Sequence, residues 1–255
     1  MTASSNDIAP STSAWAARAV ALRPEGRAFI DGEYRSAASG ETFACISPAT
    51  GRVLAQVAHG DAADVDLAVR AARRAFDDGR WARQAPAGRK KVLERFAELV
   101  TEHREELALL ETLDMGKPIS DSLNVDLRSS ANCIAWYGEA VDKVYDEVAP
   151  TRHTELGLIT REPVGVVGAV VPWNFPLLMA CWKIAPALAA GNSVVLKPSE
   201  KSPLTAIRVA ALAVEAGIPP SSTSCRASGK PPGRRWRYTW TSMCSRSPAR
   251  RGPAS

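Results

Sequence analysis

Apolar side chains recur at helical spacing in three long segments of the first 143 residues. The first helix should be capped by Asp61, and its core face is predicted to be Val65, Val69, Ala72 and Phe76. The second should end at Gly116, because glycine favours the left-handed cap and Pro118 cannot continue the helix. Its core face is predicted to be Leu93, Phe96, Val100, Leu107 and Leu110. The third spans about 120–143, and its mixed acids and bases are typical of a solvated surface.

Shorter segments alternate apolar and polar side chains, as half-buried strands do. Asp31 and Gly32 suit the two-residue turn of a hairpin over residues 29–34. Further short strands are predicted at 42–46, 52–58, 147–150 and 156–161, and a short helix at 12–23.

A different pattern begins at Gly165, where apolar runs are continuous. Residues 166–171 and 193–197 predict strands of a parallel sheet covered on both faces. Residues 177–190 predict a helix that is buried all round, and residues 202–216 predict an amphipathic helix. The order strand, helix, strand, helix is that of a doubly wound α/β sheet.

Twenty uncharged residues, 163–182, are long enough to cross a bilayer. Pro172 and Pro176 lie in the middle of this run and would break a helix there, leaving backbone groups without partners in lipid. We therefore expect a buried strand, a turn and a buried helix, and no membrane span.

Charge and composition divide the chain at residue 220. Residues 221–255 hold seven Arg, one Lys and no acid, whereas residues 1–220 carry 24 bases and 27 acids. The tail has eight Ser and four Pro but no Leu, Ile, Val or Phe, so it should be disordered. We expect an N-terminal extension at 1–25, a domain at 26–220 and a basic tail at 221–255. The acidic body argues against nucleic-acid binding, although a tail with Trp236 and Trp240 among its cations could stack on single strands.

The cysteines and histidines show no metal-binding pattern. The three histidines are isolated, and no two cysteines form a C-x-x-C pair. The five cysteines are Cys45, Cys133, Cys181, Cys225 and Cys244. Reduced thiols and an N-terminus without a secretory pattern predict a cytoplasmic protein.

Candidate chemistry gathers after the two predicted parallel strands, at the carboxyl edge where ligands bind in such sheets. Asn174 could donate to a developing oxyanion, or it could bond its own turn. Lys197 could bind a cofactor hydroxyl or phosphate, or extend its ammonium to solvent. Glu200 could accept hydrogen bonds from a ribose or stabilise the start of the next helix. Lys183, inside the apolar helix, would need a partner if buried. No G-x-G-x-x-G is present, so these residues alone leave the cofactor open.

The segment VPWNFPLLMACWKIAPALAAGNSVVLKPSEKSPL, residues 171–204, resembles the signature region of the aldehyde dehydrogenase superfamily. FIDGEYRSAASGETFACISPATG and LALLETLDMGKPI resemble the same family, and the resemblance extends from about 27 to 220. The subgroup that the sequence resembles most is that of the bacterial γ-glutamyl-γ-aminobutyraldehyde dehydrogenases of putrescine breakdown.

The resemblance implies a fold and a chemistry. The fold would be α/β, an incomplete Rossmann-like cofactor-binding domain with N-terminal helices and a strand segment, 147–161, that pairs between subunits of a homo-oligomer. Family members oxidise an aldehyde to a carboxylic acid through a cysteine thioester, and hydride passes to NAD(P). Asn174 would hold the oxyanion, Trp173 would line the cofactor cleft and Lys183 would belong to a proton path. Lys197 and Glu200 would bind the adenosine ribose, and Glu200 would repel a 2′-phosphate, which favours NAD over NADP.

Several family motifs have no counterpart in this sequence. The G-S-T helix start that holds the pyrophosphate, the E-x-G-G-K glutamate and the G-Q-x-C nucleophile are all missing. We therefore expect a truncated, inactive fragment whose tail arose by a shift of reading frame. The alternative is a half-enzyme that binds a nucleotide or an intact subunit without turnover.

Overall fold

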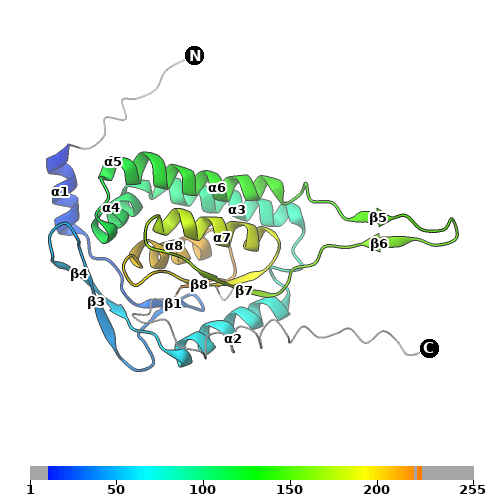
Figure 1. Ribbon diagram of the computed structural model, residues 1–255, viewed down its shortest axis with the longest axis horizontal. Coiled ribbons are helices and arrows are strands. Elements are labelled where there is room, and N and C mark those ends of the chain that lie inside the picture. The colour runs from blue at the N-terminus through cyan, green and yellow to red at the C-terminus, as the bar shows by residue number, and fades with distance from the viewer. Residues whose placement is uncertain (1–10, 221–222, 226–255) are drawn as a thin grey trace, which may run out of the picture.

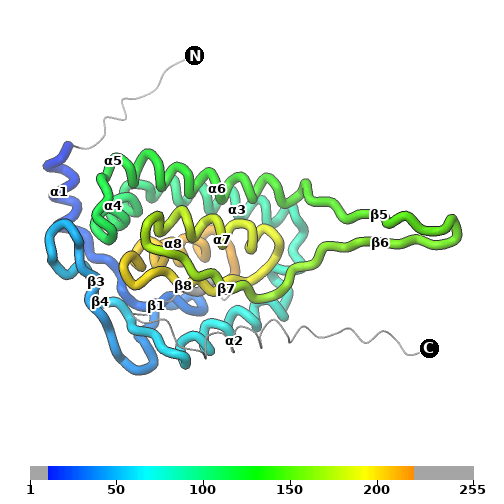
Figure 2. The backbone as a smooth tube through the Cα atoms, in the orientation of Figure 1, coloured from blue at the N-terminus to red at the C-terminus, as the bar shows by residue number. Residues whose placement is uncertain are grey.

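Helices cover both faces of a central sheet in the computed structural model, which describes residues 11–220 and 223–225 (Figures 1 and 2). The sheet runs in the order β2-β1-β9-β8-β7. Its strands are β1 (Ala28–Ile30), β2 (Glu33–Arg35), β7 (Val166–Val170), β8 (Ser193–Lys197) and β9 (Thr223–Cys225). One face is covered by α2 (Ala62–Asp78), and the other by α7 (Pro176–Ala189) and α8 (Leu204–Glu215). Helices α3 (Pro86–Glu102) and α6 (Arg128–Ala140) pack over α7 from outside.

The predicted parallel unit is confirmed. Strands β7 and β8 pair in parallel register from Val166 opposite Ser193 to Val170 opposite Lys197. Four of the five β8 residues are buried, as expected for a strand with helices on both faces. The uncharged run at 163–182 forms β7, a turn and the start of α7. In the described part of the chain, no helix combines the length and apolar character that crossing a membrane requires.

The predicted start of an unstructured tail at residue 221 was wrong for Thr223–Cys225. These residues form β9, which pairs in parallel with β8 and antiparallel with β1. The backbone N–H and C=O groups of β9 pair with those of β8, and without β9 this edge of β8 would have no hydrogen-bonding partner. Average composition missed it because a strand of three residues needs neighbouring strands more than apolar side chains. Residues 221–222 and 226–255 lie outside the described part of the chain.

The N-terminal hairpins follow the predicted pattern. Asp31 and Gly32 have φ of 55° and 81°, the positive values that a tight turn between β1 and β2 needs. Strands β3 (Thr42–Ile46) and β4 (Val53–Ala58) form a second antiparallel pair. The short helix α1 (Thr12–Ala21) precedes both hairpins and is capped by the Ser11 hydroxyl.

The capping of α2 and the burial of Ala72 were predicted correctly, but the rest of its buried face was not. The Asp61 side chain accepts backbone N–H groups, and Asp64 completes a capping box. The side chains of Val65, Val69 and Phe76 are half-buried, and the fully buried side is small. It consists of Asp64, Ala68, Ala71, Ala72 and Ala75. Alanines let the helix lie close to the sheet, where they contact side chains of β1, β7 and β8.

Two predicted helices are divided. The second consists of α3 and α4 (Arg104–Met115), which meet at His103, where a ψ of 15° turns the chain. Helix α4 ends at Gly116 with φ 82°, as predicted. The third consists of α5 (Ile119–Asp121), the π-helical turn η1 (Ser122–Leu127) and α6. Its polar side was predicted to be solvated, yet Ser122, Asp126 and Ser130 are all buried.

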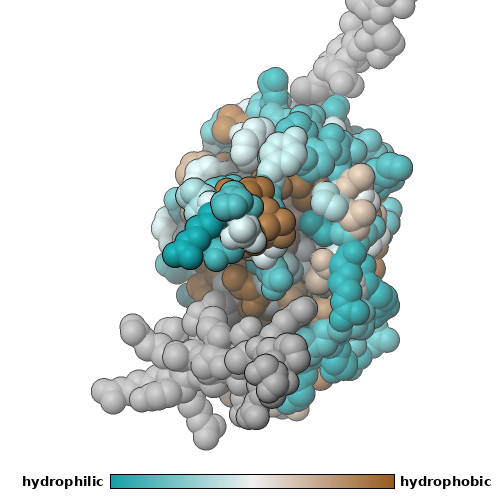
Figure 3. All heavy atoms as spheres, turned by 90° about the vertical axis from the view of Figure 1, so that its right-hand side faces the viewer, coloured by the Kyte–Doolittle hydropathy of each residue, from teal (hydrophilic) through white to brown (hydrophobic). Residues whose placement is uncertain are grey.

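A hairpin of β5 (Glu147–Ala149) and β6 (Gly157–Ile159) projects from the body of the protein (Figure 1). Both strands were predicted. Val148 and Leu158 on this hairpin are 69% and 63% exposed. Figure 3 views the end that bears the hairpin and shows apolar side chains among hydrophilic ones. Apolar groups on an exposed strand pair are typical of a surface that another chain covers.

The C-terminal end of α7 is held by side chains from other elements. Trp81 Nε1 donates to the Leu188 carbonyl at 3.0 Å, and Arg89 Nε donates to the Ala189 carbonyl at 3.1 Å. Asn192 donates to the Ala187 carbonyl at 3.1 Å and accepts the Gly165 N–H at 2.9 Å. These bonds add side-chain donors to the carbonyls of the last helical turn, and they fix α7 against the start of β7.

We predict that Trp81→Phe lowers the free energy of unfolding by about 1–3 kcal/mol, because a smaller ring replaces the buried indole and its hydrogen bond to the Leu188 carbonyl is lost. Urea unfolding of the full chain measures this change. The control is Trp182→Phe, at a side chain that is 52% exposed and should change stability by less than about 0.5 kcal/mol. Equal losses for the two variants would contradict the prediction.

Candidate functional site

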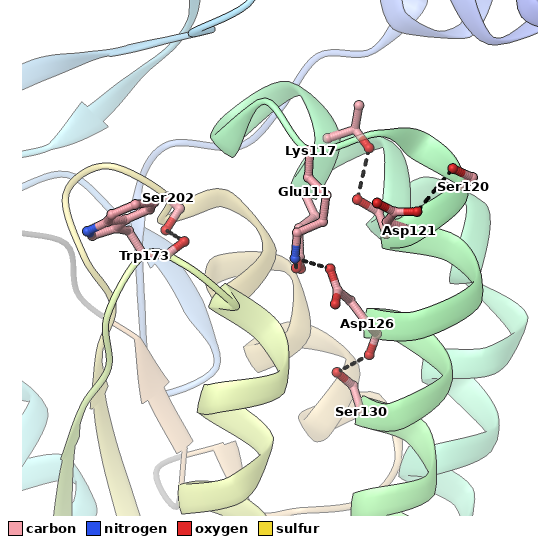
Figure 4. Close-up of polar contacts among 10 residues, drawn as sticks. Glu111, Lys117, Ser120, Asp121, Asp126, Ser130, Trp173 and Ser202 are labelled. Carbon is pink, nitrogen blue, oxygen red and sulfur yellow. Dashed lines mark hydrogen bonds and ion pairs between the residues drawn. The ribbon is translucent and has the colours of Figure 1, made fainter.

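The carboxyl ends of β7 and β8 bring two turns to one edge of the sheet. The N–H of Val171 donates to the Lys197 carbonyl at 3.1 Å, which extends the pairing to the ends of the strands. The hydroxyl of buried Ser202 donates to the carbonyl of Trp173 at 3.4 Å and ties the two turns together (Figure 4). The predicted juxtaposition of the turns is therefore confirmed.

Asn174 lies in the turn between β7 and α7, and its side chain is exposed. Trp173 and Phe175 on either side are 49% and 39% exposed. Within the described residues, the amide of Asn174 has no hydrogen bond to the protein, so it does not cap its own turn. Its NH₂ group is therefore available to a ligand oxygen.

A cavity of about 370 Å³ opens against this edge. Trp173, Glu200 and Lys201 line one side, and Lys201 Nζ lies 5.6 Å from the centroid of the Trp173 ring. The other side consists of residues from the β3–β4 hairpin and the end of α4, namely Ala44, Ile46, Pro48, Asp114 and Met115. The structure thus brings Trp173 and Glu200 together around one space, whereas Asn174, Lys183 and Lys197 are not among its lining residues.

Lys197 is the last residue of β8 and is half-buried. Its Nζ donates to the carbonyl of Pro198 at 3.1 Å, which holds the ammonium at the strand end. Glu200, three residues on, is also half-buried. An ammonium donor and a carboxylate acceptor therefore leave the same strand toward the same edge.

The prediction that the helix at 177–190 is buried all round was wrong for the side of the helix that carries Lys183. Lys183 is exposed, and the neighbouring Trp182 is 52% exposed. Helix α7 buries Cys181 and Ile184 on the sides that face the sheet and the helices. Apolar composition indicated burial, but in the described part of the chain no element covers this stripe.

A buried charged cluster beneath the Asn174 turn escaped the sequence analysis. Glu111 on α4 and Asp126 on η1 have fully buried side chains, and Lys117 is 11% exposed between them. Lys117 pairs with Asp126, and its Nζ lies 3.7 Å from Glu111 Oε1 (Figure 4). The same ammonium lies 4.2 Å from the centroid of the Phe175 ring. Asp126 had been assigned to a solvated face, because its spacing carries no sign of the partners that Glu111 and Lys117 supply.

Burial dominates the electrostatics of this cluster. It raises the pKa of Glu111 to about 8, and the nearby Asp126 carboxylate raises it further than Lys117 can lower it. By hydrogen-bond geometry, neither Glu111 oxygen nor Asp126 Oδ1 has a partner in the described residues, and the nearby Asp126 carboxyl and Leu177 backbone act on the pKa of Glu111 in opposite directions. An ionised carboxylate without such partners is costly, so Glu111 holds its proton at neutral pH.

Asp114 joins three elements at the cavity. Its Oδ1 accepts the Cys45 thiol at 2.7 Å, and its Oδ2 accepts the N–H of Leu204 at 2.9 Å. The second bond satisfies an unpaired donor at the start of α8. Burial raises the pKa of Asp114 to about 6, although both hydrogen bonds oppose the shift.

The described thiols are not set up as nucleophiles. Burial raises the pKa of Cys45, Cys133 and Cys181, so each is protonated at neutral pH. The Cys244 position lies outside the described residues. Within the described part of the chain, no group of three or more His, Cys, Asp or Glu side chains is placed to hold a metal ion.

Comparison with known proteins gives a single family. The sequence model of the Aldehyde dehydrogenase family matches residues 34–228, past the predicted boundary at 220. The NADP/NAD-dependent aldehyde dehydrogenase PuuC of Escherichia coli is 58% identical over 205 residues, which cover 80% of this chain and 41% of PuuC.

Solved structures give the same result. Indole-3-acetaldehyde dehydrogenase AldA of P. syringae, in a complex with NAD+ and IAA, is 65% identical with a TM-score of 0.84. Gamma-glutamyl-gamma-aminobutyraldehyde dehydrogenase of Burkholderia cenocepacia is 62% identical with the same TM-score. Each comparison covers 85% of this chain and 44% of the other, so the chain spans less than half the length of these two proteins and of PuuC.

We predict that Glu111 makes the protein less stable as pH rises from 6 to 8. The folded state keeps the Glu111 proton to a pKa of about 8, whereas the unfolded state releases it near 4.5. The folded state therefore binds more protons in this window, and its stability is lost as pH rises through the folded pKa. Asp114, whose pKa in the folded state is about 6, also makes the protein less stable as pH rises, but it does so at pH values below this window.

Urea unfolding at several pH values measures the slope. Glu111→Gln should flatten it, because glutamine is neutral throughout. Asp66→Asn, at an exposed position on α2, should leave the slope unchanged. A slope that Glu111→Gln does not alter would show that Glu111 is already ionised.

Proposed function

The chain belongs to the aldehyde dehydrogenase family, and on that premise we propose that residues 26–220 form the NAD-binding part of an enzyme that oxidises an aldehyde to a carboxylic acid. The observation that carries the proposal is the edge of β7 and β8, where Trp173 and Glu200 line one cavity. Lys197 leaves the same edge. Ligands of doubly wound sheets bind in this position.

The residues present suit the adenosine end of a dinucleotide. The Glu200 carboxylate accepts hydrogen bonds from the ribose hydroxyls, and the Lys197 ammonium donates one. A carboxylate at this place repels the 2′-phosphate of NADP, so NAD is preferred. When bound, NAD supplies the hydride acceptor of the reaction.

Asn174 provides, in our proposal, the hydrogen bond that stabilises the developing oxyanion. Its NH₂ group has no partner among the described residues and donates to the oxygen of the substrate as negative charge develops there. A single donor of this kind lowers the activation free energy of an acyl-transfer step by about 3 kcal/mol. Lys183 is exposed on α7, the helix that follows this turn, and belongs, in our proposal, to a proton path.

We propose gamma-glutamyl-gamma-aminobutyraldehyde as the substrate of the intact enzyme. The supporting observation is the similar structure that is named for this aldehyde, which is 62% identical over the part of the fold that carries Asn174. AldA, which is 65% identical, is named for indole-3-acetaldehyde, so that aldehyde is the competing substrate to be tested beside it.

A second candidate function is binding to an intact subunit without turnover. The projecting β5–β6 hairpin favours it, because Val148 and Leu158 remain exposed on strands that offer open edges. Co-purification with a full-length homologue would support this function, and a monodisperse monomer that ignores the homologue would count against it.

The sequence beyond residue 220 differs in composition from the rest of the chain, because it is rich in Arg and Ser and contains no acidic residue. We propose that a shift of reading frame produced the arginine- and serine-rich sequence. The family match to residue 228 and strand β9 support a point of change later than 220. Resequencing the DNA across codons 220–230 tests this origin.

We predict that the chain binds NAD+ and that Lys197→Met weakens binding about tenfold, the effect of losing one charge-assisted hydrogen bond of about 1.4 kcal/mol. Titration calorimetry with NAD+ and NADP+ measures both affinities. Glu200→Gln should narrow the preference for NAD+. Lys91→Met, at an exposed position on α3, is the matched control. Tighter binding of NADP+ than of NAD+ would contradict the assigned role of Glu200.

We predict that the 255-residue polypeptide oxidises no aldehyde. The three thiols that the structure describes are protonated at neutral pH, and the sequence has no G-Q-x-C segment. Absorbance at the NADH wavelength with γ-glutamyl-γ-aminobutyraldehyde as substrate measures turnover. NADH production that survives mutation of all five cysteines would point to a contaminant, and production that depends on one cysteine would overturn the prediction.

A further inference from the structure

Lys117 connects the helical layer to the turn that carries Asn174. It follows α4, and its ammonium pairs with Asp126 on η1 and lies 4.2 Å from the centroid of the Phe175 ring. Phe175 is the residue between Asn174 and the start of α7. A cation over the face of an aromatic ring is attracted by the negative charge of the ring face, and more strongly where the pair is partly removed from water. The contact therefore restrains the turn from below.

The charges around Lys117 do not balance if every group is ionised. One ammonium lies between the carboxyl groups of Glu111 and Asp126, both of them fully buried. Two oxygens of Glu111 and one of Asp126 lack hydrogen bonds among the described residues. One proton on Glu111 restores neutrality, which is favoured where the carboxyl groups are fully buried.

The charges around Glu111 determine whether the Lys117 ammonium is attracted more strongly to Glu111 or to the Phe175 ring. The titratable groups that face Glu111 are Asp126 on η1, Lys117 after α4 and the thiol of Cys181 on α7, and the backbone of Leu177 lies near it as well. None of the side chains except Lys117 carries positive charge. An ionised Glu111 would therefore attract the ammonium 3.7 Å away, in competition with the Phe175 ring.

We propose that Lys117 is a positioning residue for the oxyanion turn and that the proton on Glu111 sets how firmly Lys117 holds Phe175. With Glu111 neutral, the ammonium is shared between Asp126 and the Phe175 ring, and Asn174 is held in one orientation. With Glu111 ionised, the ammonium moves toward Glu111 and the turn is released. The inference rests on the proposed role of Asn174, but the contact itself is tested without a cofactor or turnover.

The π-helical turn η1 indicates that the contact between Lys117 and Asp126 is not incidental. It places Asp126 inside the protein, where Ser130 Oγ donates to its backbone carbonyl at 2.7 Å. Such turns are rare, because their backbone bonds are less favourable than those of an α-helix, and they occur mostly at functional sites. Here the turn brings a carboxylate within reach of Lys117.

Fluorine NMR of the full chain, with 4-fluorophenylalanine in place of Phe175, tests the proposal. Phe175 is 39% exposed, so the added fluorine has room. The resonance should shift with pH with a midpoint near 8, the pKa of Glu111. Glu111→Gln should abolish this titration and hold the resonance at its low-pH position. Lys117→Met should move the resonance and remove its pH dependence, and Lys117→Arg should restore both.

The matched control is Lys201→Met, which removes an ammonium that lies at this edge, 5.6 Å from the Trp173 ring, and not against Phe175. It should leave the position-175 resonance and its titration intact. Circular dichroism identifies any variant that has lost its fold, and Glu111→Gln, a neutral isostere, serves if Lys117→Met is unfolded. A resonance that does not titrate between pH 6 and 9, or that titrates equally in Glu111→Gln, would overturn the proposal. Failure of NAD+ binding would leave this result unaffected.

Discussion

The in-register parallel pairing of β7 with β8 is the constraint on which the rest of the structure depends. Because both strands run in the same direction, both turns at their carboxyl ends emerge at one edge. Trp173 and Glu200 then line one cavity although 27 residues separate them in the chain. Helices α7 and α8 start from these turns and cover the sheet, so the core and the candidate site are built by the same pairing.

The edge is also held from the layer of helices outside the sheet. Asp114 at the end of α4 accepts the first N–H of α8, and Lys117 just beyond contacts Phe175. Both links begin within one short segment of the chain. A change in that segment therefore reaches the edge of β7 and β8 although the segment belongs to neither strand.

Much of this arrangement could be predicted from local patterns, because the signals were local. Gly116 and Pro118 indicated a helix end, and Pro172 indicated the turn after a strand. The buried cluster could not be predicted, since Asp126 reads as one more surface acid until Glu111 and Lys117 are folded against it. The exposure of Lys183 and the strand Thr223–Cys225 also depend on neighbours distant in sequence, which composition does not report.

The central claim is that this chain carries the adenosine-binding edge of an aldehyde dehydrogenase. A crystal structure of the chain grown with NAD+ tests it most directly. The account predicts the adenosine ribose hydroxyls within hydrogen-bonding distance of Lys197 Nζ and the Glu200 carboxylate, beside Trp173. Nucleotide density at any other part of the sheet, with Lys197 and Glu200 turned away from it, would contradict the account.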